Sequence, residues 1–77
     1  MSRKSKTEMP LAPIENIIRE TTEMRVSDKG ARELRRILTE LAEELADDAA
    51  EYSKFAGRQT IKDRDIALAY RNMRKQR

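Results

Sequence analysis

The side chains that could do chemistry in this 77-residue chain are carboxylates, guanidiniums, amines and hydroxyls, because it contains neither cysteine nor histidine. Histidine is the commonest general base, and both residue types are the usual ligands of zinc. Their absence also removes the Ser-His and Cys-His pairs that activate nucleophiles. No constellation of catalytic groups can be assembled from the rest. We therefore expect no enzyme, no metal site, no cofactor and no small-molecule substrate.

The basic residues are concentrated at the two ends of the chain. Residues 1–10 carry three basic residues against one acidic residue, and residues 57–77 carry seven against two. Residues 28–56 hold eight acidic against five basic residues. The net charge is only +3, so it is this distribution that favours a polyanionic partner bound at particular surfaces. On charge alone, a well-solvated helical protein without such a partner fits equally well.

A basic tail and a short helix are predicted before the middle of the chain. Residues 1–10 have no hydrophobic periodicity and are mostly charged or small, which predicts disorder. Pro13 is suited to the first position of a helix, because its missing N–H loses no hydrogen bond there. The apolar face of this helix is formed by Ile14, Ile17 and Ile18. We expect the helix to end near residues 20–21.

The second helix is the dominant element of the prediction. Ser27 is a good N-cap, and Gly57 is the natural residue to end the helix. Between them, apolar residues recur at steps of three and four, at Leu34, Ile37, Leu38, Leu41, Leu45, Ala49, Tyr52 and Ala56. Nearly thirty helical residues extend about 45 Å, more than the diameter of a globular protein of this size. Two short flanking helices cannot cover such a face, so we expect a second chain to do so.

A third helix completes the predicted fold. Residues 58–61 predict a loop with a brief strand, and the helix follows from Asp63 to about Arg74. Its expected inner face comprises Ile66, Ala69, Tyr70 and Met73. Residues 75–77 would form a basic C-terminal tail. The sequence has no apolar stretch long enough for a membrane span or a signal peptide, which favours the cytoplasm.

The segments LAPIENII, RVS and AGRQTIKDRDIALA resemble those of the archaeal histones. The match runs without gaps from Leu11 to about Met73. It implies an all-α histone fold over residues 11–74, with a short helix, a long central helix and a short helix joined by two loops. It also implies a handshake dimer, in which loop 1 of one chain lies beside loop 2 of the other. The expected dimer core comprises Leu34, Ile37, Leu38, Leu41 and Leu45.

The same resemblance assigns roles to residues of the two loops. Arg25 matches the arginine that histones insert into the minor groove of DNA. Thr60 and Lys62 match phosphate contacts of loop 2. Further candidate DNA contacts are Arg19 and Gln59. For these residues the alternatives are solvated arginines, turn chemistry and helix capping. Arg58 and Asp65 match a salt bridge that fixes loop 2 to the third helix.

Several positions depart from the family pattern. Asn16 and Gln59 stand where an arginine and a lysine are common, so we expect weaker and less salt-sensitive DNA binding. Thr22 replaces a small glycine of loop 1, and Phe55 replaces a histidine used between dimers. Phe55 and the nearby Tyr52 are therefore candidates for a more apolar dimer–dimer contact. This favours a dimer or a closed tetramer over a long wrapped superhelix.

The sequence thus predicts an architectural protein that binds double-stranded DNA with little sequence preference and bends, wraps or bridges it. We expect a homodimer or a tetramer, associated with the nucleoid and not with a membrane. The competing hypothesis is a histone-fold interaction module that pairs with a different protein and binds DNA weakly. RVS and RQTIK favour DNA, whereas the acidic stretch 43–51 leaves room for the alternative.

Overall fold

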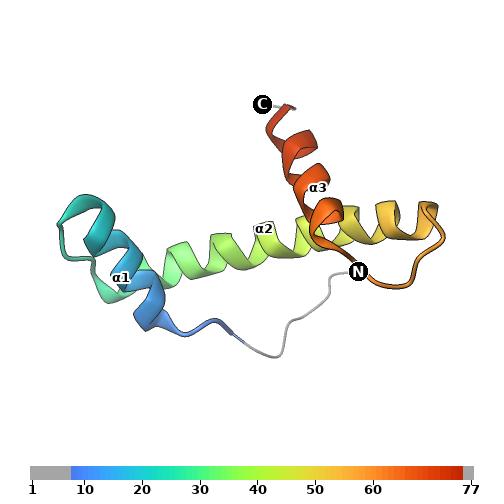
Figure 1. Ribbon diagram of the computed structural model, residues 1–77. Helices are drawn as coiled ribbons and strands as arrows, with labels where there is room; N and C mark the ends of the chain where they lie inside the picture. The colour runs from blue at the N-terminus through green and yellow to red at the C-terminus, as the bar shows by residue number, and fades with distance from the viewer. Residues whose placement is uncertain (1–7, 76–77) are drawn as a thin grey trace. The chain divides into compact units, whose positions relative to one another are not determined.

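The computed structural model describes residues 8–75, which form three α-helices and no strand (Figure 1). They are α1 (Leu11–Thr22), α2 (Asp28–Phe55) and α3 (Asp63–Lys75). The predicted all-α class and the short-long-short order are confirmed. The chain divides into two compact units, which lie on either side of the boundary between residues 40 and 41 within α2. No described helix is both long and apolar enough to cross a membrane.

The limits of α1 differ from the prediction at both ends. The helix begins at Leu11, and Pro13 is its third residue. Proline is tolerated there because the first four N–H groups of a helix have no intrahelical partner. Thr22, predicted to lie in the loop, is the last helical residue. Its hydroxyl donates a hydrogen bond to the Ile18 carbonyl at 2.7 Å and accepts one from the Met24 N–H at 3.1 Å. This side chain extends the helix by satisfying groups at its end.

The limits of α2 match the sequence. The Ser27 hydroxyl accepts a hydrogen bond from the Gly30 N–H at 2.9 Å, as an N-cap residue does. At the other end Gly57 has a φ of +77°, in the left-handed region that glycine adopts without steric cost. Its N–H donates to the Lys54 carbonyl at 2.9 Å, which satisfies a carbonyl of the last turn.

The unit formed by residues 8–40 packs α1 against the start of α2. Ile14 and Ala31 are its buried apolar residues. The residues just before α1 are also held in place, because Arg35 forms an ion pair with Glu8 at 3.4 Å and donates to the Met9 carbonyl at 3.3 Å. The prediction of a disordered tail over residues 1–10 therefore does not hold for residues 8 and 9, which Arg35 contacts. Residues 1–7 lie outside the described residues.

The unit formed by residues 41–75 packs α3 against the end of α2 through small and polar side chains. Ala49 and Ala69 are buried, and the Asn72 amide donates a hydrogen bond to the Tyr52 hydroxyl. The predicted inner face of α3 was partly wrong, since Ile66 and Tyr70 are 39% and 47% exposed. The inner positions of α3 are taken instead by Asp65, which bonds to loop 2, and by Asn72, which bonds to Tyr52 of α2. Lys75 is still helical, and residues 76–77 of the predicted tail lie outside the described residues.

The brief strand predicted within residues 58–61 is absent. A strand needs a neighbouring backbone to complete its ladder of hydrogen bonds, and a single chain offers none here. The carbonyls of Arg58 and Thr60 instead accept hydrogen bonds from the Ser53 hydroxyl, at 3.2 and 3.0 Å. The loop is therefore held by side-chain contacts.

Most of the apolar stripe along α2 is not covered by the rest of the chain. Ile37 and Leu41 are 39% and 36% exposed, and Leu34, Leu38 and Leu45 are only half-buried. Among the described residues, the buried apolar side chains are Ile14 and three alanines, Ala31, Ala49 and Ala69. A core of this size supplies little of the apolar burial that stabilises a folded protein.

We predict that Leu41→Ala lowers the free energy of unfolding by about 2–4 kcal/mol, the cost of truncating a buried leucine. We expect this cost because a partner chain should cover the Leu41 side chain in the folded assembly. Thermal unfolding monitored by circular dichroism measures the change, and Ala substitution of the neighbouring exposed Glu40 is the control. The melting temperature of the unmodified protein should also fall by roughly 5–10 °C on hundredfold dilution. A concentration-independent melting temperature would contradict obligate association.

Candidate nucleic-acid interface

Loop 1, residues 23–27, is shaped by a left-handed residue at its start. Glu23 has a φ of +62°, and its N–H donates to the Arg19 carbonyl at 2.7 Å. A non-glycine residue adopts this conformation at a cost. The Thr22 hydroxyl bonds described above lie on either side of this turn and fix it. The path of loop 1 is therefore set by local hydrogen bonds.

The second anchor of loop 1 is the contact between Val26 and Gly30. A Cβ atom added at Gly30 would lie 2.9 Å from Cγ2 of Val26, too close for an ordinary contact. The glycine therefore lets Val26 pack on the first turn of α2. Arg25, the residue before this anchor, is exposed, and within residues 8–75 no carboxylate pairs with it. A cation held on a fixed loop without an internal partner is available to an external anion.

Arg19 and Arg25 belong to the same small hollow of about 190 Å³, which is also lined by Glu15, Met24 and Val26. The guanidinium of Arg19 donates a hydrogen bond to the Asn16 side-chain carbonyl one turn earlier. Sequence reasoning treated Asn16 only as a lost positive charge. In the structure this residue also holds an arginine on the side of α1 that adjoins loop 1.

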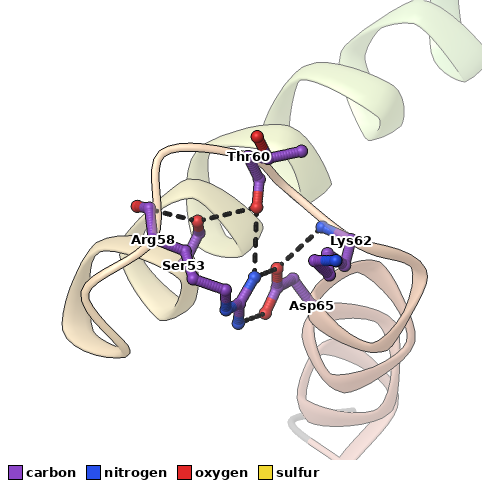
Figure 2. A network of polar contacts seen from close by, with 5 residues as sticks. All are labelled: Ser53, Arg58, Thr60, Lys62 and Asp65. Carbon is purple, nitrogen blue, oxygen red and sulfur yellow. Dashed lines mark hydrogen bonds and ion pairs between the residues drawn. The ribbon is translucent and has the colours of Figure 1, made fainter.

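Loop 2, residues 56–62, is organised by the ion pair between Arg58 and Asp65 (Figure 2). The two guanidinium Nη atoms donate to the two carboxylate oxygens at 2.8 and 2.9 Å, a bidentate geometry. The same carboxylate accepts the Lys62 N–H at 2.8 Å, and Arg58 also donates to the Thr60 carbonyl at 3.1 Å. The pair predicted from the sequence is therefore present. It caps α3 and turns loop 2 carbonyls inward.

The same contacts determine the charge of Asp65. This residue is only 3% exposed, yet the Arg58 guanidinium and then the Lys62 N–H hold the pKa of its carboxyl well below the usual range. Asp65 in turn raises the pKa of Arg58. The pair is thus fully ionised at neutral pH, and Arg58 is committed to supporting loop 2.

The other predicted residues of loop 2 lie on the outside of this network. The Thr60 side chain points away from the Arg58–Asp65 pair while its backbone carbonyl points toward it (Figure 2). Gln59, Thr60 and Lys62 are all exposed. A hydroxyl, an amide and an amine are thereby presented together on one loop. These are donors suited to phosphate oxygens.

Sequence reasoning missed Ser53, which is 2% exposed and reaches two carbonyls of loop 2. The signal that could have found it is its position, four residues after Ala49, where the apolar pattern of α2 predicts a buried side chain. A buried hydroxyl requires a hydrogen-bond partner, so this serine should contact another segment of the chain.

The environments of the two candidate interface aromatics also differ. Tyr52 is half-buried and bonded to Asn72, whereas Phe55 is 96% exposed.

Three helices in the order short-long-short, with capped loops on either side of the long helix, define a histone fold. Residues 7–70 match the family of histone-like transcription factors (CBF/NF-Y) and archaeal histones. The chain is similar to one subunit of the archaeal histone HAN1 of Thermococcus zilligii, with 42% identity over 62 residues that cover 80% of this chain and 92% of that protein. It is 33% identical over 64 residues to probable archaeal histone 3 of Methanocaldococcus jannaschii, covering 83% of this chain and 96% of that protein.

The chain therefore belongs to the family of histone-like transcription factors and archaeal histones, and it is of the archaeal type. Its function is that of an architectural protein that packages DNA, and it is not an enzyme. Members of this family bind DNA and dimerise through the histone fold, which accounts for the uncovered apolar stripe of α2. The family identified from LAPIENII, RVS and AGRQTIKDRDIALA is confirmed.

We predict that Asp65→Asn lowers the melting temperature at pH 7 by roughly 5–10 °C, because it leaves Arg58 without a counter-charge in a half-buried position. Since the pKa of Asp65 is depressed in the folded state, its stabilisation is complete above the ordinary carboxyl pKa of about 4. It is lost as the pH falls below that value toward the folded pKa. The difference in melting temperature between wild type and variant should accordingly shrink between pH 5 and pH 2.

The matched control for this comparison is Asp63→Asn, an exposed acid in the same turn of α3. It should change the melting temperature by no more than about 2 °C at either pH. Equal effects of the two substitutions, or a difference that does not depend on pH, would contradict the role given to the Arg58–Asp65 pair.

Proposed function

We propose that this chain forms a homodimer that binds the backbone of double-stranded DNA with little regard to sequence. Loop 1 contributes Arg25, with Arg19 beside it, and loop 2 contributes Thr60, Lys62 and Gln59. Arg25 enters the minor groove, and the loop 2 donors hold phosphate oxygens. The protein acts on the chromosome, within the nucleoid, and residues 11–74 are the part that folds and binds.

The observation that carries this proposal is that each loop is fixed from inside while the side chains of Arg25, Gln59, Thr60 and Lys62 are exposed, with no ion pair to Arg25 or Lys62 within residues 8–75. Loop 1 is fixed by Thr22 and by the Val26–Gly30 contact, and loop 2 by the Arg58–Asp65 pair. Prepositioned donors lose little conformational entropy when they bind an anion. Contacts to phosphate oxygens carry no sequence information directly. Binding that tolerates sequence follows from this chemistry.

Pairing of identical chains is supported by the stripe on α2 itself. An interface in which the same residues of two copies face one another requires one self-complementary surface. Ile37, Leu38 and Leu41 follow one another at helical spacing near the middle of α2. The second candidate partner is a different histone-fold protein, since the relative from Thermococcus zilligii is named as one subunit of a histone. The mass of the purified chain alone decides between the two.

Assembly beyond the dimer is proposed to stop at a closed tetramer. Phe55 is 96% exposed and lines a hollow of about 450 Å³ with Tyr52, Ala67 and Leu68 and with the charged residues Arg58, Arg64, Asp65 and Arg71. An exposed aromatic beside a partly apolar hollow is typical of an interface anchor. Thr22, which carries a side chain in place of the glycine of wrapping relatives, would crowd the stacked turns of a superhelix. Discrete units that bend or bridge DNA are the expected product.

We predict that Arg25→Ala weakens binding to unrelated duplexes by a similar factor of about ten, with an unchanged melting temperature. Two copies of a minor-groove and phosphate contact are lost per dimer, and neither reads sequence. Gel shift at fixed salt on two duplexes of different composition measures the effect. Arg36→Ala is the matched control, because Arg36 is an exposed arginine already paired with Glu33 and Glu40. Normal binding by Arg25→Ala, or loss on one duplex only, would contradict the assignment.

We predict that nuclease digestion of DNA saturated with the protein leaves one short limiting fragment, because assembly closes at the tetramer. The Phe55→Glu variant should shorten that fragment to the length protected by a dimer, roughly 30–40 bp. Glu51→Gln, an exposed change one turn earlier on α2, is the control and should leave the fragment unchanged. A ladder that continues to grow in regular steps well past tetramer size would show that dimers polymerise.

A further inference from the structure

The outer face of α3 is a strongly charged surface that takes no part in the DNA contacts proposed for the two loops. The inner face of the helix is defined by Asp65, Ala69 and Asn72, which are buried or half-buried against α2 and loop 2. At 100° per residue, the opposite side carries Asp63, Arg64, Ala67, Tyr70, Arg71 and Arg74, with Lys75 at its edge. All seven are exposed. Four cations and one carboxylate therefore surround the small Ala67 on the outer side of α3.

The charges of this face, which we call the α3 outer face, are mostly not neutralised internally. Within residues 8–75 no salt bridge engages Arg71 or Lys75. Arg74 lies over the Tyr70 ring, 5.6 Å from its centroid, which holds the guanidinium in place without cancelling its charge. These three cations line a shallow hollow of about 480 Å³ together with Ala67 and Tyr70. No acidic residue lines it.

The α3 outer face is also unsuited to the dimer interface. The surfaces that a partner chain must cover are apolar, such as the stripe of α2 and the exposed Ile66 of α3. Removing several unpaired cations from water at such an interface carries a large desolvation cost. The face therefore stays in solvent when the dimer forms. It ends about 20 Å along the helix from loop 2, given 13 residues at 1.5 Å each.

We propose that the α3 outer face binds the phosphate backbone of a second DNA duplex, so that one dimer holds two duplex segments together. Charge complementarity selects a polyanion, and the central Ala67 leaves room for a backbone to approach the flanking guanidiniums. A dimer already seated on DNA is surrounded by a high local concentration of neighbouring duplex. Weak phosphate contacts then suffice to join two segments. This inference depends on the proposed function, since the first segment is held by the two loops.

The test is a capture assay with one duplex tethered to beads and a second, labelled duplex of unrelated sequence in solution. The protein is added at the level that saturates the tethered duplex, with wild type compared to R71Q/K75Q. We expect the variant to bind a single short duplex within about threefold of wild type. We expect it to capture at least tenfold less labelled duplex, because it removes two cations per chain, four per dimer, that would neutralise phosphates of the second duplex.

The matched control is R32Q/R36Q, which also removes two exposed cations per chain but takes them from ion pairs with Asp28, Glu33 and Glu40. Its capture should stay within twofold of wild type. The Phe55→Glu variant should also capture the second duplex, because the two segments are joined by one dimer. Loss of capture in Phe55→Glu would overturn the proposal by showing that tetramers join the duplexes.

Two other results would overturn it. Unchanged capture by R71Q/K75Q would show that the α3 outer face takes no second duplex and leave an acidic protein partner as the better occupant. An equal loss of single-duplex binding and of capture would show that this face extends the first site. If wild type fails to bind the tethered duplex at all, the proposed function fails; if it binds but captures nothing, only the present inference fails.

Discussion

The structure depends on a long helix whose apolar stripe the chain cannot cover by itself. α2 has 28 residues, which corresponds to about 42 Å at 1.5 Å per residue. The contacts that α2 makes within the chain use small residues, such as Ala31 and Ala49, which let the short helices approach closely. Its larger side chains, such as Ile37 and Leu41, remain exposed for a partner. We therefore expect folding and association to be one process, as in obligate dimers.

Unlike the apolar stripe, the two loops need no second chain to hold them, because polar contacts within each half of the chain fix their conformations. Thr22, Ser27 and Gly30 determine loop 1, and Ser53, Arg58 and Asp65 determine loop 2. Hydrogen bonds of this kind satisfy the unpaired groups at helix ends and so define where each helix stops. In the function proposed above, the apolar stripe forms the dimer, while the caps fix the loops that contact DNA. Separate residues would then serve stability and binding.

The sequence predicts the long helix best, because Ser27 and Gly57 mark its ends and the stripe between them is regular. It predicts the limits of α1 less well. The Thr22 hydroxyl extends this helix through bonds to the Ile18 carbonyl and the Met24 N–H, and these bonds form only once the backbone has turned at Glu23. The strand expected near Ile61 was wrong because it needs a neighbouring backbone. The Arg58–Asp65 pair was predicted through family resemblance, and seven residues of separation alone would not have identified it. Ser53 was missed because a serine on a helix is usually solvated, and its burial depends on where loop 2 returns.

The account is tested most directly by the mass of the complex between the purified chain and a short duplex. Native mass spectrometry on two duplexes of unrelated sequence gives the number of chains bound to each. We expect an even number of identical chains, with two as the smallest complex and no difference between the sequences. A complex containing a single chain would contradict the account, as would a chain that binds DNA only when a different histone-fold protein is added.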